Sequence, residues 1–195
     1  YASSGPAVLL MHGLTRNSAD FEGLASALGG QYRLIVPDQR GRGRSQWDAD
    51  PARYRPDIYA QDMLALLDSL QIDRVATIGT SMGGIIAMLM AATQRERLSA
   101  LVLNDVGPEV SAEGLSRISS YVGETGPFAS WAEAAEACRR QNAVALPDYS
   151  DAQWLAFAQR LCTQRPDGSI AFAYDPAIAK PLANGESTDA PDLWP

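Results

Sequence analysis

Short apolar segments alternate with helix-like segments over the first half of this 195-residue chain. The segments 7–11, 32–36, 74–79 and 98–103 are each flanked by turn-forming residues, as is typical of strands buried on both faces. The stretches between them carry apolar residues at spacings of three and four, the pattern of amphipathic helices. Parallel strands joined by helices require right-handed crossovers. We therefore expect an α/β fold with a central parallel sheet that has helices on both faces.

The pattern changes near Gly107, and we place a domain boundary after it. The rest of the chain has helix signals, among them the capping-box patterns Ser130-x-x-Glu133 and Ser150-x-x-Gln153. Residues 170–174 alternate as in one short strand. The sequence predicts an α/β core over residues 1–107 and a mostly helical cap, placed as a lid, over residues 108–195.

The charge balance bears on possible partners. The chain has 16 basic and 23 acidic side chains and a formal net charge of -7. Binding to nucleic acid needs a basic stripe, so we expect no nucleic-acid partner. No window approaches the roughly 18 consecutive apolar residues of a membrane-spanning helix, and the first residues lack the pattern of a signal peptide. We expect no membrane association.

Cysteine and histidine are scarce. The two cysteines, Cys138 and Cys162, lie among apolar neighbours, which indicates buried, reduced thiols and predicts a cytoplasmic protein. With a single histidine, the chain shows no cluster of metal ligands, and its glycines fit neither a dinucleotide fingerprint nor a P-loop. We therefore expect neither a metal nor a cofactor. The oligomeric state is open.

The segment Gly79-Thr80-Ser81-Met82-Gly83 has the form G-x-S-x-G, between a predicted strand and a predicted helix. A sharp strand-to-helix turn holds the central residue in a strained conformation and raises its hydroxyl above the sheet. Gly79 and Gly83 avoid collisions in such a turn, and the helix N-terminus favours developing negative charge. We interpret Ser81 as a nucleophile. The alternative is a tight turn whose serine only caps the helix.

The segment His12-Gly13-Leu14 follows the first predicted strand. A tetrahedral oxyanion needs two aligned donors, and the residue after the nucleophile supplies one through its backbone N–H. We expect the second donor to be the N–H of Leu14, beside that of Met82, with Gly13 permitting the necessary turn. His12 lies next to this proposed oxyanion site, so we expect it to order the loop and not to act as the general base.

Four segments together resemble the α/β-hydrolase superfamily, within the group of small serine hydrolases that carry a helical lid. They are Leu10-Met11-His12-Gly13-Leu14-Thr15-Arg16-Asn17, Asp38-Gln39-Arg40-Gly41-Arg42-Gly43-Arg44-Ser45, Gly79-Thr80-Ser81-Met82-Gly83-Gly84 and Leu103-Asn104-Asp105-Val106-Gly107-Pro108. The resemblance implies the catalytic order serine, acid, histidine, with Ser81 as the serine. A serine at this position, where dehalogenases and epoxide hydrolases use aspartate, implies acyl transfer.

The chain departs from the family pattern after the cap. No histidine follows Ser81, and the family's sheet has more strands than the four counted here. We expect the chain to be an internal piece of a longer protein, cut at both ends, without the catalytic histidine and with little activity of its own. Asp105 follows the last predicted strand, where some members place their acid; the alternative is that it orders the loop into the cap.

We predict a cofactor-free hydrolase of small carboxylic esters or lactones that works through an acyl-serine intermediate. Alternatives on the same fold are a C–C bond hydrolase, a perhydrolase-type haloperoxidase and an acyltransferase. A different class, a non-catalytic small-molecule receptor, also stays open. In the loop 38–45, we expect Arg40, Arg42 and Arg44 to pair with nearby carboxylates, while a substrate-anion role for one of them is the alternative.

Overall fold

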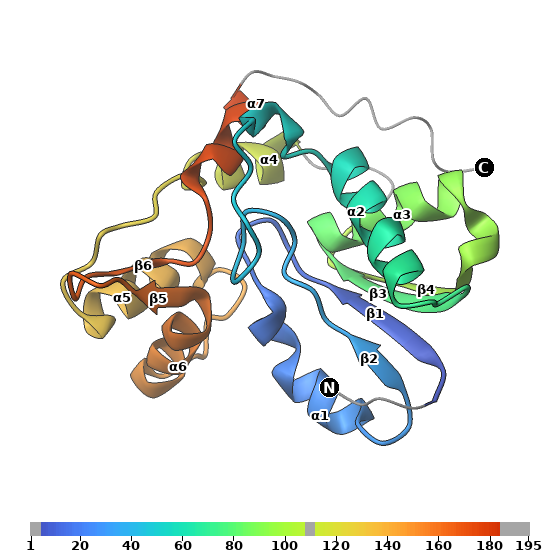
Figure 1. Ribbon diagram of the computed structural model, residues 1–195. Helices are drawn as coiled ribbons and strands as arrows, with labels where there is room; N and C mark the ends of the chain where they lie inside the picture. The colour runs from blue at the N-terminus through green and yellow to red at the C-terminus, as the bar shows by residue number, and fades with distance from the viewer. Residues whose placement is uncertain (1–4, 108–111, 184–195) are drawn as a thin grey trace.

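The computed structural model describes residues 5–107 and 112–183, and its centre is a parallel sheet (Figure 1). The strand order is β2-β1-β3-β4. The strands are β1 (Ala7–Met11), β2 (Arg33–Ile35), β3 (Val75–Thr80) and β4 (Leu98–Asn104). This confirms the expected sheet, with every strand end within one residue of its predicted position. Because the strands are parallel, the loops that follow β1 and β3 meet at one edge of the sheet.

Helices cover both faces of the sheet. Val8 and Leu10 of β1 point into a cluster with α1 (Glu22–Leu28), whereas Leu9 and Met11 face α2 (Pro56–Ser69) and α3 (Met82–Thr93). Successive side chains of a strand point to opposite faces of the sheet. Both faces of β1 are buried, which explains why every residue of this strand is apolar. A 3-10 turn, Ser18–Phe21, precedes α1, so the helical stretch expected between the first two strands starts in a tighter form.

The edge strand β4 is less covered than the sequence pattern suggests. Leu101 is 38% exposed and Val102 is 50% exposed. In the described part of the chain, α3 packs near β4, while α1 lies at the other end of the sheet (Figure 1). The expected helices on both faces of the sheet are confirmed, and β4 has partly exposed side chains at the edge of that sheet.

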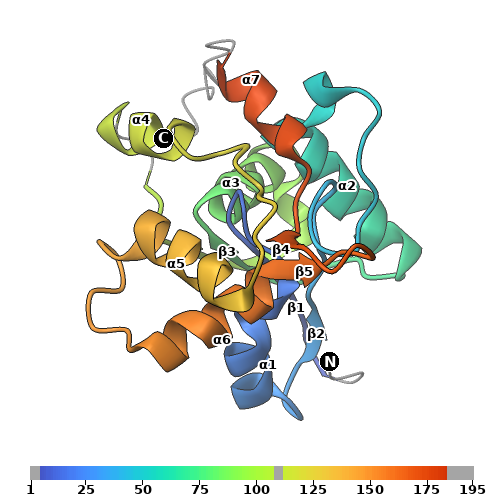
Figure 2. The same cartoon turned by 90° about the vertical axis from the view of Figure 1, so that its left-hand side faces the viewer.

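The segment predicted as the cap, for which we keep that name, contains most of the remaining helices. It comprises α4 (Ala112–Ser119), α5 (Trp131–Asn142), α6 (Asp151–Leu161), the antiparallel pair β5 (Cys162–Gln164) and β6 (Ile170–Phe172), and α7 (Lys180–Ala183). In two views, α5, α6 and the β5–β6 pair lie beyond the carboxyl ends of the strands (Figures 1 and 2). The predicted boundary between residues 107 and 108 stays a prediction, since residues 108–111 lie outside the described residues.

The two predicted capping boxes differ. At the start of α6, Ser150 and Gln153 satisfy each other's backbone N–H groups, as predicted. At the start of α5, Ser130 accepts from the N–H of Glu133, but the Glu133 carboxylate accepts from the N–H of Ala129 at 2.9 Å. The second prediction is therefore only half right, because the glutamate reaches one residue further back.

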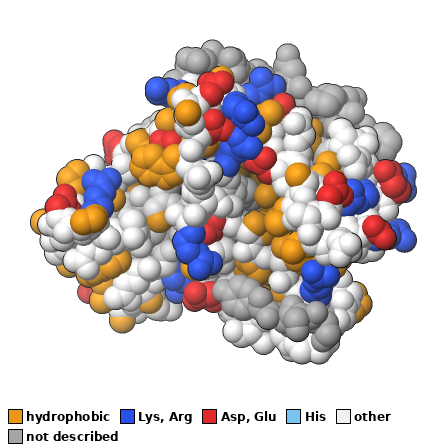
Figure 3. Space-filling model, in the orientation of Figure 1, with side chains coloured by type: hydrophobic (Ala, Val, Ile, Leu, Met, Phe, Trp, Pro, Cys, Tyr) orange, Lys and Arg blue, Asp and Glu red, His pale blue; other side chains and the backbone are white. Residues whose placement is uncertain are grey.

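Charged side chains are mixed on the face shown in Figure 3, where Lys and Arg lie among Asp and Glu without forming one basic stripe. Within the described residues, every helix is too short or too polar to cross a bilayer. The predicted absence of nucleic-acid and membrane partners stays a prediction.

Candidate active site

Ser81 occupies the junction between β3 and α3 in a strained conformation. Its backbone angles are φ 51° and ψ -118°, a left-handed region that costs a non-glycine residue about 1–3 kcal/mol. The Ser81 N–H donates to the carbonyl of Asn104 at 2.9 Å, which fixes the turn to the end of β4. The Ser81 side chain does not cap α3. The strain is thus not compensated by a cap, as it would be if the serine served the helix alone.

Gly79 and Gly83 permit close backbone contacts around this turn. A Cβ on Gly79 would lie 2.3 Å from the carbonyl oxygen of Gly83, and one on Gly83 would lie 2.0 Å from that of Met11. Both distances are far below any van der Waals contact. The turn therefore requires glycine at both positions, and it packs directly on the end of β1.

The loop after β1 lies beside Ser81. A Cβ on Gly13 would lie 3.8 Å from the Cβ of Ser81. Among the described residues, the N–H of Leu14 makes no hydrogen bond, and the N–H of Met82 belongs to the first turn of α3, where helices leave donors free. Two main-chain donors are thus unpartnered in the segments that flank Ser81, while the oxyanion site itself stays a prediction.

His12 is fully buried and held at both ring nitrogens. Its Nε2 accepts from the N–H of Gln39 at 3.1 Å, so Nδ1 carries the proton and donates to the carbonyl of Gly13 at 2.8 Å. That carbonyl shares a trans peptide with the N–H of Leu14, so the two groups point in opposite directions. Burial lowers the pKa of His12 to about 4. The imidazole is neutral, and it orients the Leu14 amide.

The loop 38–45 contains three arginines with different partners. Arg40 pairs with Asp48 and, at 2.6 Å, with Asp62, and the exposed Arg44 lies 3.9 Å from Asp38. The prediction of carboxylate pairing is wrong for Arg42, which is buried and donates to main-chain carbonyls and a tyrosine hydroxyl. Glycines at positive φ on both sides, Gly41 and Gly43, let the loop turn this side chain inward.

Asp38 supports the same loop. Burial alone would raise the pKa of Asp38. Its carboxylate accepts hydrogen bonds from the backbone N–H groups of Arg44 and Ser18, at 2.9 and 2.7 Å. These bonds outweigh burial and lower the pKa. The carboxylate is therefore ionised, and it connects this loop to the segment that follows Gly13.

Asp105 lies exposed after β4, with φ 56°. Within the described residues, its carboxylate makes no hydrogen bond or ion pair. The structure therefore places both Asp105 and Ser81 where the strands of the sheet end, without joining the two side chains. Its role as the catalytic acid stays a prediction, as does its role in ordering the loop.

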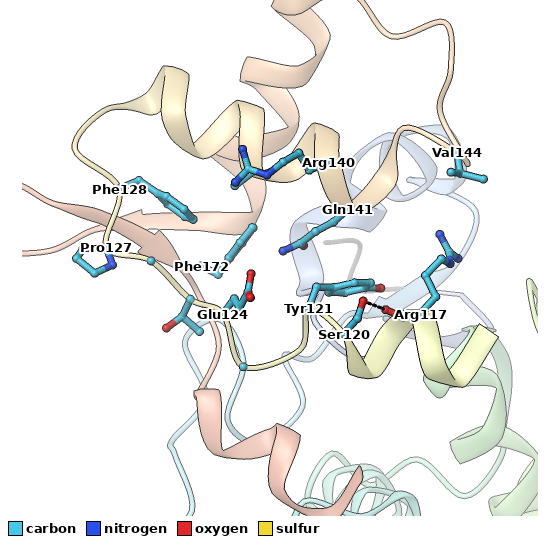
Figure 4. A pocket seen from close by; sticks show the side chains of 14 residues that line it. Arg117, Ser120, Tyr121, Glu124, Pro127, Phe128, Arg140, Gln141, Val144 and Phe172 are labelled. Atoms are coloured by element: carbon cyan, nitrogen blue, oxygen red, sulfur yellow. Dashed lines mark hydrogen bonds between the residues drawn. The ribbon is translucent and has the colours of Figure 1, made fainter. Parts of the chain in front are cut away.

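The cap contains a cavity of about 580 Å³ (Figure 4). The rings of Tyr121, Phe128 and Phe172 line it, together with the charged side chains of Arg117, Glu124 and Arg140. In the described part of the chain, neither arginine has a carboxylate within ion-pair distance. The same residues include no group of three or more His, Cys, Asp or Glu side chains that could hold a metal ion.

Comparisons with known proteins agree on the fold. The profile of the alpha/beta hydrolase fold matches residues 6–167. A 3-hydroxybutyrate-oligomer hydrolase from Cupriavidus necator is 37% identical over 183 residues, which cover 92% of this chain and 62% of that protein. A 2-(acetamidomethylene)succinate hydrolase from Mesorhizobium japonicum is 33% identical over 119 residues, or 61% of this chain and 42% of that protein.

A solved structure extends the similarity to the whole chain. The alpha/beta hydrolase from Novosphingobium aromaticivorans is 46% identical, with a TM-score of 0.92, and the match covers 100% of this chain and 70% of that one. The matches thus span between 42% and 70% of the lengths of these three proteins. From the profile match, the parallel sheet and the strained serine turn together, we conclude that the chain belongs to the alpha/beta hydrolase fold family.

Proposed function

We propose that the protein is a serine hydrolase that cleaves carboxylic ester bonds through an acyl-serine intermediate. The observation that carries this proposal is the conformation of Ser81. The backbone of Ser81 is strained, and its side chain does not cap α3. The unpartnered amides of Leu14 and Met82 belong to the segments that flank it. Strain that persists at such a position is typical of a reacting group.

In the proposed reaction, the Ser81 hydroxyl attacks the carbonyl carbon and the N–H groups of Leu14 and Met82 bind the oxyanion. The positive end of the α3 dipole adds to this stabilisation. The alcohol then leaves, and water releases the acid from Ser81. Small esters and lactones share this chemistry, so both belong to the proposed substrate class.

The relative from Cupriavidus necator is named for 3-hydroxybutyrate oligomers, which are chains of ester bonds. We extend this to the present protein as a preference for short esters of hydroxy acids. This preference rests on the name of that relative, because the residues that line the cap cavity include Glu124 beside Arg117 and Arg140 and do not include Ser81. Amides are the substrates with which these esters should be compared, because the name of the relative from Mesorhizobium japonicum contains an acetamido group.

In the described residues, the Ser81 hydroxyl makes no hydrogen bond to a side chain that could act as the general base. The sequence has one histidine, and both ring nitrogens of His12 are occupied by main-chain groups. We therefore assign the base to a residue outside these 195. Without a complete triad, the 195-residue chain should exceed the uncatalysed rate by only about 10³–10⁴.

Hydrolysis rates test the proposal. The full-length protein should hydrolyse p-nitrophenyl butyrate and the dimer of 3-hydroxybutyrate, and Ser81→Ala should abolish both activities. Ser69→Ala, which changes an exposed serine at the end of α2, is the matched control and should leave the rates unchanged. Full activity of Ser81→Ala would overturn the proposed mechanism. Cleavage of a vinylogous diketone in preference to all esters would favour a C–C bond hydrolase.

A further inference from the structure

Arg42 contacts both residues whose amides form the proposed oxyanion site. It is fully buried, and its Nε donates to the carbonyl of Leu14 at 2.8 Å. Its Nη2 lies 3.8 Å from the Sδ atom of Met82. One rigid guanidinium therefore connects the loop after β1 to the first residue of α3, on either side of Ser81.

The charge of Arg42 has no close carboxylate among the described residues. Instead, Nη1 donates to the hydroxyl of Tyr59 at 2.7 Å and to the carbonyl of Arg40 at 2.8 Å. The rings of Tyr59 and Tyr54 lie 4.9 and 5.7 Å from the guanidinium carbon. Buried charges are normally paired directly with an opposite charge. Here the buried Asp175 belongs to the same network only through the hydroxyl of Tyr54, which donates to it at 2.6 Å, so the guanidinium itself pairs with neutral groups.

The loop that carries Arg42 is also fixed to the cap. The N–H of Gly43 donates to the carbonyl of Ala173 at 2.7 Å, and the N–H of Asp175 donates to the carbonyl of Gly41 at 2.8 Å. These two bonds flank the bridge between Arg42 and Tyr174. The backbone of Arg42 is thus held by the cap while its side chain reaches the core.

We propose that Arg42 is a positioning residue for the oxyanion site, which sets the distance between the Leu14 loop and the Met82 amide and supplies positive charge below them. This inference rests on the proposed function of Ser81. It assigns a second anchor to the loop: His12 fixes the peptide that carries the Leu14 N–H, and Arg42 fixes the peptide that follows it. A donor pair held from both sides does not need to reorganise when negative charge develops.

Substitutions of Arg42 separate charge from geometry. Arg42→Gln removes the charge and the forked donors, and it should lower kcat by about 10–10² with a much smaller change in KM, because small displacements of catalytic donors are costly. Arg42→Lys keeps the charge but cannot reproduce the fork, so it should lower kcat less. The matched control is Arg44→Gln in the same loop, whose side chain is 94% exposed and which should keep the wild-type kcat.

A spectroscopic readout distinguishes positioning from a merely structural role. An aryl trifluoromethyl ketone forms a hemiketal with the active-site serine, and fluorine NMR reports the pKa of the bound oxyanion. Arg42→Gln should raise that pKa by about 1, since a nearby positive charge is lost. Arg42→Lys should leave it close to the wild-type value. A structural role alone would lower the melting temperature and leave the hemiketal pKa unchanged.

Different results would overturn the inference about Arg42 and the proposed function of Ser81. Wild-type kcat and an unchanged hemiketal pKa in folded Arg42→Gln would overturn the inference, while loss of activity in Ser81→Ala would still support the proposed function. If neither Arg42 variant folds, Tyr59→Phe decides, because it removes only the hydroxyl that anchors Nη1. Its kcat should fall at unchanged KM, and a wild-type kcat would overturn the inference.

Discussion

Asn17 donates from Nδ2 to the backbone carbonyl of Arg160 at 2.8 Å, and so joins the loop after β1 to α6 of the cap. The same side chain accepts from the N–H of Ala19 at 3.0 Å, which caps the 3-10 turn that follows. The adjacent Arg16 places its guanidinium carbon 4.3 Å from the centre of the Phe157 ring. The segment that carries the proposed oxyanion donor is therefore also a docking point for the cap.

Substitution of Asn17 separates its two bonds. Asn17→Asp keeps the acceptor for Ala19 but loses the donor to Arg160, and it places a carboxylate near a carbonyl oxygen. We expect a loss of about 1–2 kcal/mol in the free energy of unfolding, measured by urea denaturation. If Asn17 only capped the turn, aspartate would serve equally well and the stability would not change.

Gly83 and Gly23 form a matched pair of helical glycines. A Cβ on Gly83 would lie 2.0 Å from the carbonyl oxygen of Met11, whereas one on Gly23 would meet nothing within 4 Å. Gly83→Ala should lower the free energy of unfolding by about 3 kcal/mol or more, because the backbone must move to admit the methyl group. Gly23→Ala should stabilise the protein by about 0.5–1 kcal/mol. Thermal unfolding followed by circular dichroism compares the two, and equal melting temperatures would contradict the close packing of α3 on β1.

The buried His12 gives the stability of the protein a pH dependence. Burial lowers its pKa from 6.5 to about 4, so between these values the unfolded chain binds a proton that the folded chain does not. Stability contributed by this group is therefore present above pH 6.5 and falls as the pH decreases toward 4. The free energy of unfolding should be about 2 kcal/mol lower at pH 5 than at pH 7.

The control for this prediction is His12→Gln, which lacks the titrating ring. Between pH 7 and pH 5, the free energy of unfolding of this variant should fall by about 2 kcal/mol less than that of the wild type. Parallel pH profiles for the two proteins, measured by urea denaturation, would show that His12 is not responsible.

Local patterns were sufficient to predict the sheet and the serine turn. The run Ala7–Met11 is apolar at every position because its side chains alternate between two clusters, and both clusters are buried. The glycines around Ser81 indicated a close approach between chain segments, and the structure shows which backbone atoms they approach. These features depend on neighbours in the sequence, so the sequence alone could reveal them.

Other features depend on residues far apart. Cys162 continues the apolar spacing of α6, so the sequence did not show that the chain turns there into β5 and pairs with Phe172. Arg42 lies in a charged loop between two glycines, a context that favours exposure. Its burial is set by Leu14 and Tyr59, which the fold brings to it from other elements.

Covalent labelling of Ser81 tests the central claim most directly. The full-length protein is treated with a fluorophosphonate, digested, and examined by mass spectrometry for the modified peptide. We predict stoichiometric modification at Ser81, none in Ser81→Ala, and loss of ester hydrolysis in step with labelling. Modification elsewhere, or ester hydrolysis that persists while Ser81 is blocked, would contradict the assignment of Ser81 as the nucleophile.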